Sequence, residues 1–146
     1  MAVTRLLDVN VLIALTWPHH VHHNAARSWF AGVRGNGWAT CPLTEAGFVR
    51  VSCNPSAVKR SVTVFDAIAL LGRLRRLESH AFWAMEHSVT ALPPGILSRI
   101  QGYRQITDAV LLGLAAQRGG RLATLDTGMA DLLAEAERDW VETIPV

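Results

Sequence analysis

The chain has 146 residues, of which 50% are hydrophobic and 18% are charged, and its formal net charge is +2. This balance excludes general disorder, and the length suits one domain with a buried core, which we expect to span residues 1–146. Arginine supplies nearly all of the positive charge, because Lys59 is the only lysine. Guanidinium groups favour bidentate phosphate contacts, so RNA or DNA is a reasonable partner, although a GC-rich genome would give the same bias.

The first third of the chain alternates between strand and helix patterns. Residues 3–7 predict a short buried strand, and the apolar residues 9–15 predict a helix that opens directly after it. Helical spacing continues over residues 22–33. A second strand is expected at residues 37–41, followed by a helix over residues 42–51 that begins with a proline.

The same alternation continues through the rest of the chain. Amphipathic spacing predicts a helix over residues 63–77, with Val64, Ile68, Leu71 and Leu74 on its apolar face. The later elements, in chain order, are a strand at 80–85, a loop at 93–95 followed by a helical segment that Gly102 interrupts, an apolar helix at 106–117, a strand at 121–125, a helix around 130–136 and a final strand at 141–144.

Neither the first apolar run nor the cysteines indicate export. The run has no small-residue cleavage site and is too short to span a bilayer. Cys41 and Cys53 form no CxxC pair and cannot build a disulfide framework. We therefore expect a cytoplasmic protein without a membrane partner.

Four acidic residues occupy related positions in this pattern. Strands that alternate with helices indicate a three-layer α/β/α sandwich with a mainly parallel sheet, and such sheets bind ligands at the carboxyl ends of their strands. Asp8 and Asp126 each follow a predicted strand, whereas Glu45 and Asp108 each lie in the first turn of a predicted helix. All four side chains are therefore expected to point into one crevice.

Such crowding of carboxylates needs a compensating cation. Two unit charges about 4 Å apart repel by roughly 4 kcal/mol at an effective dielectric constant near 20. A bound Mg²⁺ or Mn²⁺ turns this repulsion into affinity, and it can also assist the attack of water on a phosphodiester. Taken singly, Glu45 or Asp108 has a simpler explanation, because an acid in the first turn of a helix stabilises the helix dipole.

Other candidate binding groups lie outside this quartet. The HHxHH run at residues 19–23 could ligate zinc or nickel, but no cysteine lies nearby to complete such a site, and solvated loop histidines are the favoured interpretation. Arg50 and Arg104 are candidate phosphate contacts, and Trp17 is a candidate for stacking on an RNA base.

Three segments carry a resemblance to a known family. RLLDVNVLIAL, PLTEAGFVRV and ITDAVLLGLAAQRGGRLATLDTG appear in that order, and the likeness extends over almost the whole chain, from Arg5 to the last predicted strand. They resemble the PIN-domain nucleases, and within them the VapC-type toxins of type II toxin–antitoxin systems. The resemblance implies a PIN fold and a Mg²⁺- or Mn²⁺-dependent endoribonuclease that acts on structured cellular RNA such as tRNA or rRNA. It also implies a homodimer and neutralisation by a cognate VapB-type antitoxin.

The resemblance also implies roles for individual residues. Asp8 and Asp108 correspond to the principal metal ligands, and Asp126 to a ligand that binds directly or through water. Glu45, the remaining member of the acidic quartet, would complete the metal site and orient or deprotonate the attacking water. The supporting polar groups would be Asn10 and Thr124.

One departure from the family pattern leaves an alternative open. Many relatives carry a hydroxyl residue directly after the first aspartate, where this chain has Val9. A catalytically weak or inactive PIN-like module that binds RNA or protein is therefore the alternative function. A phosphatase of the haloacid-dehalogenase kind is disfavoured, because that chemistry needs an aspartate where this chain has Asn10.

Overall fold

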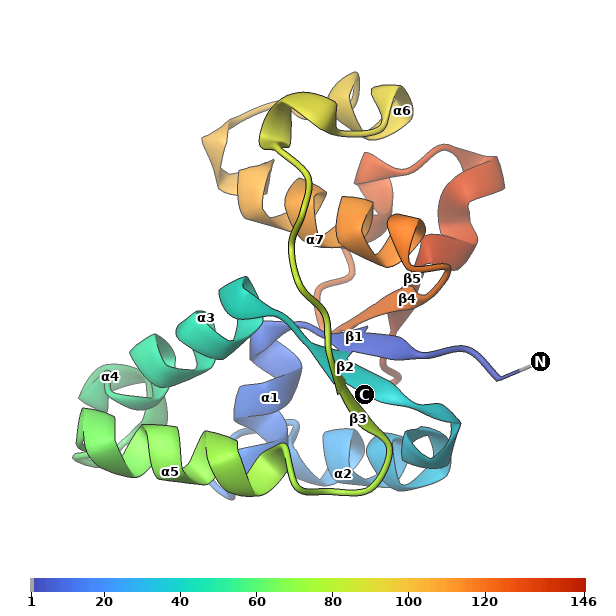
Figure 1. Ribbon diagram of the computed structural model, residues 1–146. Coiled ribbons are helices and arrows are strands. Elements are labelled where there is room, and N and C mark those ends of the chain that lie inside the picture. Colours follow the sequence, from blue (N-terminus) through green and yellow to red (C-terminus); the bar gives the residue numbers. More distant parts are fainter. Residues whose placement is uncertain (1) are drawn as a thin grey trace.

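The computed structural model describes residues 2–146, which form a five-stranded parallel sheet with helices on both faces (Figure 1). The strand order is β3-β2-β1-β4-β5, and every neighbouring pair is parallel. The strands are β1 (Arg5–Leu7), β2 (Trp38–Thr40), β3 (His80–Phe82), β4 (Arg121–Thr124) and β5 (Val141–Thr143). Each lies inside a segment that the sequence predicts as a strand, so the predicted α/β fold is confirmed.

Helices cover the sheet in two groups (Figure 1). Those before the third strand are α1 (Val9–Thr16), α2 (His23–Val33), α3 (Pro42–Ser52), α4 (Pro55–Val58) and α5 (Val64–Leu74). Those after it are α6 (Pro94–Leu97) and α7 (Ile106–Gln117). Short 3₁₀ turns complete the chain at η1 (Arg34–Asn36), η2 (Val89–Ala91), η3 (Tyr103–Gln105), η4 (Met129–Leu132) and η5 (Glu135–Trp140). Of the helices that residues 2–146 form, none is both long and apolar enough to cross a membrane.

Two hydrophobic cores lie on opposite faces of the sheet. Leu6 packs with α7 residues such as Leu112, whereas its neighbour Leu7 packs with Leu12 of α1 and Phe48 of α3. Successive side chains of a strand point to opposite faces, so one three-residue strand contributes to both cores. Both faces of β1 are therefore buried, and its carboxyl end opens directly into α1.

Two predictions for the second half of the chain need correction. The predicted loop at 93–95 is partly helical, because Pro94 occupies the first turn of α6, where its missing N–H costs nothing. The predicted helix around 130–136 is two separate 3₁₀ turns, η4 and η5. Leu133 between them has an extended backbone and is buried, which breaks the helical path.

The apolar face of α5 is only partly covered by the core. Leu71 is buried, whereas Val64 and Ile68 are 57% and 55% exposed. Phe65 beside them is 81% exposed. The first half of the helix therefore extends beyond the core and presents an apolar surface.

Candidate functional site

Asp8 is buried where β1 ends and α1 begins. Its Oδ1 accepts a hydrogen bond from Val9 N at 2.8 Å, so the carboxylate caps α1. Thr124 Oγ1, at the end of the adjacent strand β4, donates to Asp8 Oδ2 at 2.7 Å. Burial raises the pKa of Asp8 despite these two hydrogen bonds, which act in the opposite direction.

Asn10 and Thr124, the predicted supporting residues, join the ends of β1 and β4. Asn10 Nδ2 donates to Thr124 Oγ1 at 3.3 Å, and Asn10 Oδ1 accepts from Leu125 N at 3.1 Å. Thr124 Oγ1 also accepts from Asp126 N at 3.0 Å. One hydroxyl therefore contacts Asp8 and also fixes the backbone of the second strand-end acid.

Three of the four predicted acids share one cavity. Asp8, Asp108 and Asp126 line a pocket of about 400 Å³ at the carboxyl edge of the sheet, together with Asn10. Burial raises the pKa of Asp108 to about 6, and the negative charges of Asp8 and Asp126 contribute in the same direction. The three carboxylates therefore face one cavity.

The donor set suits a hard divalent cation. Carboxylate and amide oxygens are the ligands that Mg²⁺ and Mn²⁺ prefer. Within residues 2–146, however, no three His, Cys, Asp or Glu side chains stand close enough to form a metal centre of their own. Mg²⁺ keeps several of its waters and is bound directly by only one or two carboxylates, so acids that line one cavity can hold it partly through water. Asp8, Asp108 and Asp126 therefore fit such an ion.

Glu45 stands apart from these three acids. It does not line their cavity, and its Oε2 accepts a hydrogen bond from Thr40 Oγ1 at 2.6 Å. Arg75 Nη1 lies 3.6 Å from Glu45 Oε1. Because Thr40 donates its only hydroxyl hydrogen to Glu45, the 2.8 Å contact between Thr40 Oγ1 and His80 Nε2 has the imidazole as donor. Four acids were expected to converge. Three of them share one pocket, and the fourth, Glu45, lies in the first turn of α3 outside it.

Val9 packs against α3. A Cβ added at Gly47 of α3 would lie 2.5 Å from Val9 Cγ2, so the two helices approach closely at a glycine. The valine side chain fills the space above this glycine. Its presence in place of a hydroxyl residue therefore has a packing explanation that leaves the acids unchanged.

The three predicted RNA contacts differ in exposure. Trp17 is only 7% exposed, and its Nε1 donates to Ser52 Oγ at 3.1 Å. Most of the ring packs in the core, but Trp17 also lines two cavities, so the stacking expected of it stays a prediction. Arg50 and Arg104 are exposed, and Arg104 Nε donates to the hydroxyl of Tyr103 at 3.3 Å.

The histidine run forms local contacts, and one member reaches the acidic cavity. His22 N donates to His20 Nδ1 at 3.0 Å, and His23 Nδ1 contacts Ala14 O at 2.7 Å, which identifies the nitrogen as the donor. His20 lines the pocket that contains Asp8. Sequence reasoning missed this placement, because spacing within the run does not show where the loop folds.

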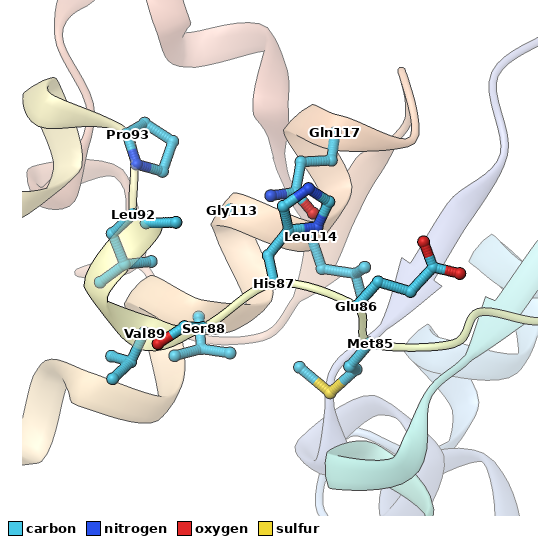
Figure 2. Close-up of a pocket in the computed structure, with 12 residues that line it drawn as sticks. Met85, Glu86, His87, Ser88, Val89, Leu92, Pro93, Gly113, Leu114 and Gln117 are labelled. Atoms are coloured by element: carbon cyan, nitrogen blue, oxygen red, sulfur yellow. The ribbon is translucent and has the colours of Figure 1, made fainter.

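A small pocket between residues 85–93 and α7 is a poor alternative site (Figure 2). Its volume is about 20 Å³, close to the space of one water molecule. Glu86 is the only acid in its lining, beside His87 and Gln117. The acidic cavity is therefore the better candidate for catalysis.

Comparison with known proteins agrees with the fold. The PIN domain family model matches residues 5–134, so the chain belongs to the PIN domain family. Among curated relatives, Ribonuclease VapC39 of Mycobacterium tuberculosis is 48% identical over 129 residues, which cover 88% of this chain and 93% of that protein. Ribonuclease VapC38 of the same organism is 46% identical over 141 residues, covering 97% of this chain and 98% of that protein.

A solved structure supports the fold independently of the sequence. The structure of FitAcB from Neisseria gonorrhoeae superposes with a TM-score of 0.59, covering 89% of this chain and 94% of that chain, at 19% identity. At this identity the similarity concerns the fold alone. Together with the family match and the curated relatives, it confirms the resemblance to VapC-type PIN domains that the sequence motifs indicate.

Proposed function

We propose that this protein is a metal-dependent endoribonuclease and the toxin of a VapBC-type toxin–antitoxin system. The observation that carries the proposal is the shared cavity of Asp8, Asp108 and Asp126 at the carboxyl edge of a PIN-domain sheet. Relatives that align over nearly their whole length are named ribonucleases, which supports RNA as the substrate. Structured cellular RNA, such as tRNA or rRNA, is the proposed substrate class.

Asp8, Asp108 and Asp126 would hold the cation, with Asn10 and Thr124 keeping the two strand ends in register. When bound, Mg²⁺ or Mn²⁺ supplies positive charge and Lewis acidity at the scissile phosphate. The buried Asp8 carboxylate contributes a fixed negative oxygen, oriented by Thr124 Oγ1 at 2.7 Å. Such prior orientation lowers the cost of assembling the site around its substrate.

Glu45 is the acid that remains available to orient and deprotonate the attacking water. It lies in the first turn of α3, after β2, and β2 is the direct neighbour of β1. Glu45 and Asp8 therefore follow adjacent strand ends at the same edge of the sheet. The hydrogen bond from Thr40 fixes Glu45 Oε2. The contact of Glu45 Oε1 with half-exposed Arg75 is longer, at 3.6 Å, so a water molecule can replace Arg75 there.

The proposed partners are a cognate VapB-type antitoxin and a second copy of the chain, in the cytoplasm. The VapC names of the relatives support this assignment. The exposed apolar residues Val64, Phe65 and Ile68 of α5 also support it, since exposed apolar patches commonly mark protein–protein contacts.

The alternative, a PIN-like binding module without catalysis, relied on Val9. The packing of Val9 on Gly47 gives this residue a structural reason that does not depend on whether the site is active. The alternative therefore has no remaining observation of its own, and the assay below distinguishes it from the proposed nuclease.

The test is cleavage of structured RNA by purified protein with Mg²⁺ or Mn²⁺, compared with the same reaction in a chelator. We expect cleavage only with the metal, and Asp8→Asn or Asp108→Asn should abolish it while the melting temperature shows an intact fold. Asp139→Asn is the matched control, because Asp139 is an exposed acid outside the cavity. Equal cleavage by Asp8→Asn and the parent protein would disprove the assignment.

A further inference from the structure

A second cavity adjoins the acidic one. It measures about 170 Å³ and shares Ile13, His20 and Ala57 with the acidic cavity, so the two cavities are direct neighbours. None of the eight residues that line it is acidic. Its polar lining comes instead from His19, His20 and Lys59, and the rest of its wall is apolar. The two neighbouring cavities therefore differ in charge: three aspartates line the first, whereas a lysine and two histidines line the second.

His20, at the junction of the two cavities, is set as a hydrogen-bond donor. Its Nδ1 accepts the backbone N–H of His22 at 3.0 Å, so Nδ1 carries no hydrogen. Burial, followed by the charges of His22 and His23, lowers the pKa of His20 and keeps the ring neutral. In a neutral imidazole whose Nδ1 is an acceptor, Nε2 carries the hydrogen. His20 therefore offers a free N–H donor that no described residue accepts.

Lys59 lies at a backbone position that favours glycine. It ends α4 with a φ of 60° in the left-handed region, and its N–H donates to Pro55 O at 2.9 Å. Helices ending in this conformation usually carry glycine or asparagine, because a Cβ is strained there. The only lysine of the chain thus occupies a position where folding alone would favour glycine, and it lines the second cavity.

We propose that this second cavity is a nucleotide subsite that binds the RNA residue next to the scissile phosphate. The Lys59 ammonium and the His20 Nε2–H would contact its phosphate oxygens, and the apolar wall of Ile13, Ala57 and Val58 would contact its base or ribose. Phosphate contacts supply most of the affinity of proteins for nucleic acids. A basic subsite is needed beside the acids, because their negative charges repel the backbone of the substrate. The inference rests on the proposed ribonuclease function.

Lys59→Gly is the discriminating variant, because it removes the charge and also relieves the left-handed backbone. We expect an equal or higher melting temperature, a KM for a labelled single-stranded oligoribonucleotide raised about tenfold, and an unchanged kcat. The salt dependence of binding should lose a slope of about 0.7, the value for one phosphate contact on a single strand. Lys59→Arg should retain the parental KM.

Two substitutions separate the donor of His20 from its role in the loop. In His20→Asn the side chain can still accept from His22 N but no longer extends to the Nε2 position, so KM should rise while the melting temperature holds. In His20→Gln the amide nitrogen can replace the Nε2 donor, so KM should stay near the parental value. Arg27→Gln is the matched control, because this exposed arginine lines a different pocket.

The outcomes also separate this subsite from the proposed function. If the parent protein cleaves RNA and Lys59→Gly has the parental KM and salt slope, the subsite is wrong and the nuclease stands. If the parent does not cleave RNA, direct binding of the same oligoribonucleotide in Ca²⁺ tests the subsite, and weaker binding by Lys59→Gly supports it. A Lys59→Gly protein that loses affinity only for a partner protein, and not for RNA, overturns the nucleotide assignment.

Discussion

Thr124 Oγ1 donates a hydrogen bond of 2.7 Å to Asp8 Oδ2, and the two residues are 116 positions apart in the chain. β1 and β4 are parallel neighbours, which brings their carboxyl ends together and allows this contact. The same hydroxyl accepts hydrogen bonds from Asn10 Nδ2 and Asp126 N. The acidic site is therefore organised before any cation binds, and the cost of this order is a buried carboxylate.

Replacing Asp8 by asparagine should stabilise the metal-free protein. Asn Oδ1 can still accept from Thr124 or cap α1, while the buried charge that raises the pKa of Asp8 is removed. We expect the free energy of unfolding to rise by roughly 1 kcal/mol, or a few degrees in Tm, in a chelator. Thermal unfolding measures it. A clear fall in Tm would mean that the carboxylate itself holds the fold together.

The raised pKa of Asp108 predicts how stability changes with pH. Its carboxyl has a pKa of about 6 in the folded protein, above the ordinary value of 3.8, so the folded state binds this proton more tightly than the unfolded state does. The stabilisation is complete below about pH 3.8 and is lost as the pH rises to about 6 and beyond. Buried Asp8, whose pKa is also raised, acts in the same direction.

Denaturant midpoints measured from pH 4 to pH 7 in a chelator check this dependence. Asp108→Asn should reduce the loss of stability across that range, whereas Asp139→Asn should not, because Asp139 is exposed. A midpoint that changes with pH to the same extent in the Asp108→Asn and parent proteins would contradict the assigned pKa.

Thr40 is expected to position Glu45 for catalysis. Thr40→Val keeps the size of this fully buried side chain but removes the 2.6 Å hydrogen bond to Glu45. We expect cleavage to fall about 10- to 100-fold, the range seen when groups that orient active-site ligands are lost. Thr40→Ser should restore activity, since it retains the hydroxyl. Stability should fall by roughly 1–3 kcal/mol in Thr40→Val, because His80 Nε2 and Glu45 lose a buried partner.

Assays of cleavage against pH distinguish positioning from a general loss of structure. If Thr40 only supports the fold, Thr40→Val should lower the amount of active protein and leave the shape of the pH profile unchanged. A changed profile in Thr40→Val that returns to the parental shape in Thr40→Ser supports the positioning of Glu45. Full activity in Thr40→Val would remove Thr40 from the account.

The contact between Val9 and Gly47 predicts a coupled pair of substitutions. Gly47→Ala places a methyl carbon 2.5 Å from Val9 Cγ2, which is closer than two carbon atoms can approach. The valine side chain has little freedom to turn away. We expect a loss of roughly 1–3 kcal/mol from this overpacking. In the Val9→Ala background the same substitution should cost much less, because the clashing methyl is gone. Additive effects in a double-mutant cycle would show that the two residues do not meet.

Local signals in the sequence were sufficient for most elements of the fold. The predicted helix at 106–117 has the observed bounds of α7, because an apolar run ends at a glycine, Gly119, whose φ is +64°. Helical spacing showed which residues of α5 share a face but not how far the core extends along it. The spacing therefore did not show that Val64 and Ile68 are exposed while Leu71 on the same face is buried.

The candidate site was predictable where it depended on the sheet and not where it depended on loops. Asp8 and Asp126 follow parallel neighbouring strands, so their proximity follows from strand order. The contact between Glu45 and Arg75 and the position of His20 in the acidic cavity result from tertiary packing between segments distant in the chain. No spacing rule relates such residues, so the sequence could not separate Glu45 from the other three acids.

Calorimetric titration of the purified protein with Mn²⁺ tests the central claim most directly, namely that Asp8, Asp108 and Asp126 together form a site for a divalent cation. Asp108→Asn should weaken Mn²⁺ binding at least about tenfold, while Asp139→Asn should retain the parental affinity. The account predicts saturable binding to the parent protein that is reduced by substitution of any of the three acids. Equal Mn²⁺ affinity in the parent and Asp108→Asn proteins would contradict it.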